Sequence, residues 1–146
     1  MRHNSGKYGI KAGATTAGRV YCYKGVRAMK LSVKLFLENE NEYVLGPGRV
    51  ELLRFVEELG SLRKAAQKLG MSYRWAWGRI NDMEKALGVF LLAQDPASGG
   101  KAKTLTAEAR ELLTWYNAIE KEMEGVFAKA SAKCPGFLGS SANGSH

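Results

Sequence analysis

Two predicted helices, each preceded by a serine and followed by a glycine, constrain the fold of this chain more than any other feature. Ser61 precedes a short periodic stretch that ends at Gly70, and Ser72 precedes a longer one that runs to about Leu87. A serine hydroxyl accepts a hydrogen bond from the first turn of a helix, and glycine readily adopts the left-handed conformation that ends one. The pattern therefore predicts a helix over 62–69, a tight turn, and a second helix.

Small side chains between the two segments indicate that these helices pack closely. Ala65 and Ala66 lie on the inward face of the first helix, and Gly70 permits the sharp turn that follows it. The spacing is that of a helix-turn-helix. A further helix is expected upstream over 49–59, because apolar residues recur there at helical intervals and Gly60 supplies a stop.

The second helix of the motif has two contrasting faces. At 100° per residue its apolar side chains share one face, which we expect in the core: Ala76, Ile80, Met83 and Leu87. The opposite face carries Arg74, Gly78, Asn81 and Lys85 and is expected to point outward. Trp75 and Trp77 lie on opposite flanks, and we expect Trp77 to pack in the core.

Short strands are expected on both sides of the helices. Residues 31–37 alternate apolar and polar side chains, and 43–45 is predicted to return as a second strand after a polar turn. After the helix-turn-helix, 89–93 and 104–105 predict a hairpin, the wing, joined by a polar loop over 94–103.

A long helix closes the periodic part of the chain. Thr106 is its expected cap, and it is predicted to end near Lys129. Its apolar stripe is longer than so small a domain can cover, which favours a homodimer that buries the stripe between two copies. The expected dimerisation residues are Leu112, Trp115, Tyr116, Ile119, Met123 and Phe127.

The fold class is thus mainly α with small β-hairpins, a winged helix-turn-helix with a long C-terminal dimerisation helix. Four segments are predicted: 1–28 as a basic extension, disordered or extended; 29–105 as the winged helix-turn-helix domain; 106–133 as the dimerisation helix; and 134–146 as a flexible tail. Met29 is an alternative natural start.

Charge is unevenly distributed along the chain, whose net charge is +8. Residues 61–103 hold eight basic and three acidic side chains, whereas 29–60 and 104–146 are mildly acidic. A basic block that coincides with the helix-turn-helix favours a polyanionic partner, namely double-stranded DNA. Arginine reads guanine, asparagine reads adenine, and glycine lets a helix approach the backbone of the duplex. The expected DNA-binding residues are Ser61, Ser72, Tyr73, Arg74, Trp75, Gly78, Arg79, Asn81, Lys101 and Lys103.

Other classes of function have less support. The apolar runs are far shorter than a membrane span, and the N-terminus lacks the apolar region of a secretory signal, so a cytoplasmic protein is expected. Cys22 and Cys134 lie far apart, and the two histidines, His3 and His146, lie near the ends, so we expect neither a metal nor another cofactor. We do not expect this protein to be an enzyme, because its sequence shows no catalytic triad or phosphate-binding loop.

Several runs resemble the N-terminal domain of molybdate-responsive (ModE-type) transcriptional regulators. They are Leu45-Gly46-Pro47-Gly48-Arg49, Gly60-Ser61-Leu62-Arg63-Lys64-Ala65-Ala66, Leu69-Gly70-Met71-Ser72-Tyr73-Arg74, Ala76-Trp77, Ser98-Gly99-Gly100-Lys101 and Leu105-Thr106. A weaker likeness to LysR-type domains runs through Met83-Glu84 and Leu87-Gly88. The resemblance covers about Met29 to Lys129 and implies a winged helix-turn-helix, a dimer through the last helix, and DNA binding around Ser72–Arg74.

Members of that family continue into small β-barrel domains that bind molybdate or tungstate, whereas this chain ends soon after its expected dimerisation helix. We therefore expect no molybdate or tungstate binding by this chain. The favoured function is a homodimeric, sequence-specific transcriptional regulator with its recognition helix, about Ser72–Leu87, in the major groove of a roughly palindromic operator. Two alternatives stay open: a dimerising protein-interaction module that modulates a full-length regulator, and an RNA-binding protein that stacks bases on Tyr73 and Trp75.

Overall fold

The computed structural model of this protein describes residues 19–22, 29–40, 42–133 and 135. The chain divides into two compact units, one formed by 34–119 and the other by 1–33 together with 120–146, and each is described by itself. Apart from Pro135, the predicted tail over 134–146 lies outside the described residues, as does most of the predicted N-terminal extension.

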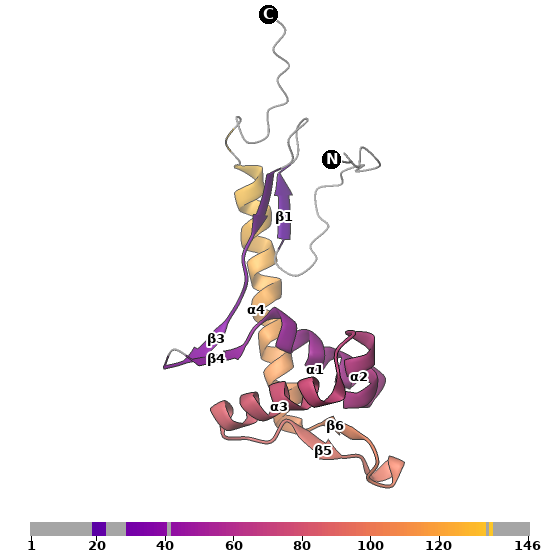
Figure 1. The fold of residues 1–146 in the computed structure, drawn as a ribbon. Helices are drawn as coiled ribbons and strands as arrows, with labels where there is room; N and C mark the ends of the chain where they lie inside the picture. Colours follow the sequence, from indigo (N-terminus) through magenta and orange to yellow (C-terminus); the bar gives the residue numbers. More distant parts are fainter. Residues whose placement is uncertain (1–18, 23–28, 41, 134, 136–146) are drawn as a thin grey trace, which may run out of the picture. The chain divides into compact units, whose positions relative to one another are not determined.

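Three helices and a hairpin form the central part of the 34–119 unit (Figure 1). Helix α1 spans Pro47–Leu59, α2 spans Leu62–Lys68 and α3 spans Tyr73–Leu87. The hairpin pairs β5 (Leu92–Gln94) with β6 (Lys103–Leu105) in antiparallel register, with Leu92 opposite Leu105. Helix α1 packs on α2, α2 packs on α3, and β6 contacts both α1 and α2. The expected winged helix-turn-helix is confirmed.

The capping residues end and begin these helices as the sequence predicts. The Ser61 hydroxyl accepts a hydrogen bond from the amide of Lys64 at 3.4 Å, and that of Ser72 accepts one from the amide of Trp75 at 3.1 Å. Gly60 ends α1 in the left-handed conformation, with φ of 67°. Cap chemistry is local, so the helix boundaries agree with the sequence to within two residues.

One apolar core unites the elements of this unit. Its innermost side chains come from β4, every helix and the wing: Val44, Leu45, Leu52, Leu53, Val56, Leu62, Ala65, Ile80, Met83, Leu91, Leu105 and Tyr116. The predicted inward face of α3 is confirmed for Ala76, Ile80 and Met83. Leu87 is only half-buried, because it is the last residue of that helix.

The strands before α1 differ from those expected. Instead of one strand over 31–37, the chain forms β2 (Met29–Ser32) and β3 (Leu37–Asn39), and β3 pairs with β4 (Glu42–Leu45). The interruption coincides with a long-range contact, in which the carbonyl of Leu35 accepts a hydrogen bond from the Tyr116 hydroxyl at 2.8 Å.

An additional strand also appears within the predicted extension. Residues Arg19–Cys22 form β1, which pairs antiparallel with β2. The sequence predicts a disordered or extended segment over 1–28, and these four residues are extended and paired. The strand was missed because this stretch has weak apolar periodicity, so its pairing is not evident from the residues alone.

The first wing strand begins three residues later than predicted. Rather than 89–93, β5 covers Leu92–Gln94. The amides of Leu91 and Leu92 donate to the Glu84 carboxylate on α3, at 2.8 and 3.2 Å. The backbone just before β5 is thus bonded to a helix side chain.

The last helix, α4, spans Ala107–Ala132. The Thr106 hydroxyl accepts from the amide of Ala109 at 3.2 Å, which confirms the predicted cap. Among the described residues, no helix combines the length and apolar character needed to cross a membrane.

Candidate nucleic-acid interface

The outer face of α3 is the strongest candidate for a binding surface. Arg74 and Lys85 are exposed on it, while Gly78 and Asn81 are half-buried. Apart from its chain neighbours and the nearby backbone of its own helix, no atom lies within 4 Å of where a side chain on Gly78 would begin, so the helix backbone is open at that point. This face is polar and basic, as the sequence predicts, and its backbone is accessible in the middle.

The first turn of α3 presents the largest exposed aromatic group on this face. The Trp75 side chain is 59% exposed. The guanidinium carbon of Arg79, one turn later, lies 5.2 Å from the centroid of the Trp75 ring. The Arg79 Nε atom is buried without a hydrogen-bond partner. Arg79 therefore lies against the indole instead of extending freely into solvent.

A second set of contacts connects α2, α3 and the wing. We call it the cation–aromatic stack, formed by Arg63, Tyr73, Trp77 and Lys103. The Arg63 guanidinium carbon lies 5.0 Å from the Tyr73 ring centroid, and Tyr73 stacks on Trp77 with centroids 6.4 Å apart and planes at 17°. Lys103 Nζ lies 5.7 Å from the Trp77 ring centroid. Trp77 also packs against the core, which confirms its expected placement.

The wing has an ordered turn. Asp95 caps the short 3₁₀ helix η1 (Pro96–Ser98) by accepting from the amide of Ala97 at 3.0 Å. The Ser98 hydroxyl accepts from the amide of Ala102 and donates to the carbonyl of Asp95, both at 2.9 Å. Lys101 is exposed beyond this turn, whereas Lys103 lies in β6 and is half-buried. The two predicted wing lysines therefore occupy different environments.

Ser61 and Ser72 have a structural task whatever else they contact. Both hydroxyls cap helices, as described above, and Ser72 is exposed at the start of α3. Their place beside the outward face is consistent with the expected binding set, and their role in binding DNA stays a prediction.

Sequence reasoning missed Arg49, whose side chain contacts the backbone of β4 and an acidic residue of α3. Its Nη1 donates to the carbonyls of Tyr43 and Val44, each at 2.7 Å, and Nη2 lies 3.9 Å from the Asp82 carboxylate on α3. Its guanidinium carbon is 4.5 Å from the Tyr43 ring centroid. Arg49 thereby connects β4, α1 and α3. The only signal was its place directly after Gly-Pro-Gly.

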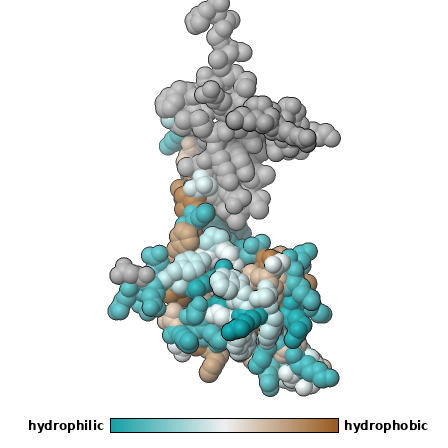
Figure 2. Space-filling model, viewed as in Figure 1, coloured by the Kyte–Doolittle hydropathy of each residue, from teal (hydrophilic) through white to brown (hydrophobic). Residues whose placement is uncertain are grey.

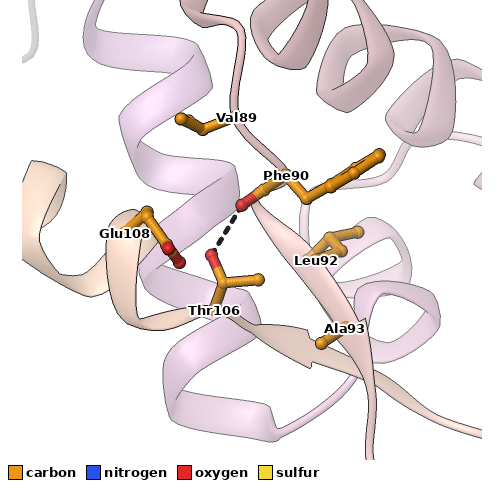
Figure 3. A pocket seen from close by; sticks show the side chains of 6 residues that line it. All are labelled: Val89, Phe90, Leu92, Ala93, Thr106 and Glu108. Atoms are coloured by element: carbon orange, nitrogen blue, oxygen red, sulfur yellow. Dashed lines mark hydrogen bonds between the residues drawn. The ribbon is translucent and has the colours of Figure 1, made fainter.

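A shallow apolar pocket lies at the base of the wing (Figure 3). It is lined by Val89, Phe90, Leu92, Ala93, Thr106 and Glu108. Phe90 is 77% exposed. Its backbone carbonyl accepts a hydrogen bond from the Thr106 hydroxyl at 2.7 Å. This pocket contains none of the residues expected to bind DNA.

The structure divides the predicted dimerisation stripe. Trp115 is 49% exposed, and Leu112, Ile119 and Met123 are half-buried. Tyr116, in contrast, is fully buried in the core of its own unit, so its assignment to a dimer surface is corrected: its ring fills the core and its hydroxyl reaches Leu35. Phe127 is also buried.

Hydrophilic residues dominate the coloured face in Figure 2, with apolar residues scattered among them.

A helix-turn-helix with an adjoining two-stranded wing and a polar, basic outer face on its second helix defines a class of protein. It is the winged helix-turn-helix, whose second helix is the recognition element for duplex DNA.

The comparisons with known proteins agree with this class. Residues 48–110 match the bacterial regulatory helix-turn-helix protein family of LysR type. The chain is 31% identical over 98 residues to the transcriptional regulator ModE of Haemophilus influenzae, an alignment covering 65% of this chain and 38% of the relative. It is 28% identical over 102 residues to the DNA-binding transcriptional dual regulator ModE of Escherichia coli, covering 68% and 38%.

A third relative has a different name. The chain is 35% identical over 79 residues to the molybdenum-pterin-binding protein MopB of Rhodobacter capsulatus, covering 52% of this chain and 28% of the relative. Residues 48–110 thus match the LysR-type helix-turn-helix domain, and the aligned part of the chain is homologous to ModE regulators. The matched part is less than two fifths of the length of these relatives.

Proposed function

We propose that this chain is a sequence-specific DNA-binding transcriptional regulator that acts as a homodimer. The observation that carries the proposal is the one-sided burial of α3. Its apolar face fills the core, and its other face leaves Arg74, Trp75 and Lys85 exposed. The family match and the names of the relatives support the same function.

In the proposed complex, α3 enters the major groove by its first two turns. Arg74 reads a guanine, Asn81 an adenine, and the open backbone at Gly78 lets the helix approach the duplex closely. Trp75 presents an apolar surface that suits a thymine methyl group, and the exposed Lys101 of the wing meets phosphate. Tyr73, Arg79, Lys103 and the two capping serines complete the proposed interface.

The proposed dimer pairs the two copies of α4. Trp115 is the exposed aromatic on this helix, and Leu112, Ile119 and Met123 extend its partly exposed apolar surface. Tyr116 is left out because it belongs to the core. Val126, 65% exposed, offers more surface than the adjacent Phe127. A two-fold axis through α4 presents two recognition helices about 34 Å apart, which requires a roughly palindromic operator.

The proposal concerns DNA binding and dimer formation. It assigns no molybdate or tungstate binding to this chain. The names of the relatives refer to proteins much longer than the matched region, and the properties of those whole proteins are not transferred to it.

Selection of bound sequences from a random DNA library tests the proposal. We expect one motif with two-fold symmetry, and a mobility shift with that motif whose affinity falls steeply with salt. Arg74→Ala is expected to weaken binding to it by about 1–3 kcal/mol and to relax one base position. Lys129→Ala, at an exposed basic position late in α4, is the matched control. Recovery of no motif would favour the protein-interaction module instead.

A further inference from the structure

The cation–aromatic stack has a property that the proposed function does not use. Its two cations come from different elements, Arg63 from α2 and Lys103 from β6, and its two aromatic rings come from successive turns of α3. Each cation lies within the distance at which an aromatic face attracts a positive charge. The rings themselves are nearly parallel. The four side chains thus form one continuous series of contacts across three elements.

Neither cation is paired with a carboxylate among the described ion pairs, which involve Arg49 and Arg110. Both keep their full charge toward a polyanion, because an aromatic face holds a cation without neutralising it. A lysine or arginine that is already held in position loses less conformational freedom when it binds than a freely rotating one does.

We propose that Trp77 and Tyr73 are positioning residues for DNA binding, and that they hold Lys103 and Arg63 in place as phosphate contacts at the two ends of the stack. The inference rests on the proposed function. It adds Arg63 to the phosphate-binding set, and it gives Trp77 a role beyond packing in the core. It also distinguishes Lys103, which is held in place, from Lys101, which is exposed.

A double-mutant cycle tests the connection between Trp77 and Lys103. Lys103→Met removes one cation, and we expect it to reduce the slope of log affinity against log salt by about 0.9, the value for one phosphate contact. Trp77→Leu keeps an apolar side chain but removes the aromatic face, and it is expected to lower affinity about 2- to 5-fold and to reduce the slope in the same direction. In the Lys103→Met background, Trp77→Leu should add little. Trp77→Phe should restore most of the affinity and the slope.

The inference is overturned if Trp77→Leu leaves the salt slope unchanged, or if the two losses multiply in the double variant. Because Trp77 packs on the core, its replacement can reduce folding, which circular dichroism monitors. The exposed end of the stack supplies a second cycle, Tyr73→Leu with Arg63→Met, in which the same pattern is expected. Independent losses there would equally overturn the inference.

A measurement without DNA separates this inference from the proposed function. In the free protein, the side-chain methylene protons of Lys103 should show an upfield ring-current shift by NMR that Trp77→Leu abolishes. A wild-type protein with this shift that selects no DNA motif would contradict the proposed function alone. A wild-type protein that selects a motif but lacks the shift would contradict the stack alone.

Discussion

Glu84 fixes the start of the wing to α3 by accepting a hydrogen bond from the amide of Leu91 at 2.8 Å. The same carboxylate oxygen accepts from the amide of Leu92 at 3.2 Å. Both amides precede or begin β5, and Leu91 is fully buried. One side chain near the end of α3 thus satisfies two backbone donors that the hairpin ladder does not.

Glu84→Ala should therefore reduce stability and loosen the wing. We expect a loss of about 1–3 kcal/mol in the free energy of unfolding, because buried amides are left without an acceptor. Urea denaturation measures it, with the exposed Glu58→Ala as control. Amide hydrogen exchange at Leu91 and Leu92 should accelerate. Unchanged exchange there would show that the carboxylate does not hold the wing.

Arg49→Met should lower the free energy of unfolding without removing any proposed contact with DNA. The variant removes a charged donor from the carbonyls of Tyr43 and Val44, and charged hydrogen bonds contribute about 1.5–3 kcal/mol. Thermal and urea unfolding check this, and Arg49→Lys should recover only part of the loss because lysine lacks the forked geometry. If Arg49→Met were as stable as the wild type, the carbonyls of Tyr43 and Val44 would be hydrogen-bonded to water in the variant.

Ser72 offers a way to separate capping from DNA binding. Ser72→Ala should lower stability by about 0.5–2 kcal/mol through loss of the cap. Ser72→Asp should retain the cap, since aspartate is also a good N-cap, yet it adds negative charge at the start of the proposed recognition helix. Stability from urea melts and affinity from mobility shifts should therefore diverge in the second variant. Equal affinity for Ser72→Asp and wild type would place this turn outside the interface.

Gly78→Ala is expected to have opposite effects on stability and binding. Alanine is favoured over glycine inside a helix by about 0.5–1 kcal/mol, and no atom within 4 Å would meet the added carbon, so stability should rise. The same carbon would stand on the face that is proposed to approach the duplex, so affinity should fall. If affinity is retained while stability rises, α3 does not approach DNA closely at this position.

The features that the sequence predicted well depend on local chemistry. Ser61, Ser72 and Gly60 determine where helices begin and end through contacts within one turn, and the inward face of α3 follows from the spacing of Ala76 and Ile80. The resulting helix-turn-helix, its wing and the outward Arg74 were all accessible to pattern reasoning.

The features that it missed depend on partners distant in sequence. The strand expected over 31–37 is interrupted where Leu35 meets Tyr116, 81 residues away. The same contact removes Tyr116 from the predicted dimer surface, because an apolar stripe does not reveal which of its members face their own core. Lys103 was expected in the polar loop over 94–103, yet it lies in β6 against Trp77, a pairing that arises only once the hairpin has folded beside α3.

Only Thr106 separates β6 from α4, and it is held at both sides. Its hydroxyl donates to the carbonyl of Phe90 (Figure 3). The same hydroxyl accepts from the amide of Ala109. Because a single residue joins the strand to the helix and is hydrogen-bonded on both sides, β6 and α4 have little freedom to move relative to one another. In the proposed dimer, the geometry of helix pairing would then set the angle of each wing directly. An operator lengthened by one base pair between its halves should be rejected, because the joint at Thr106 provides no flexible linker between the wing and α4.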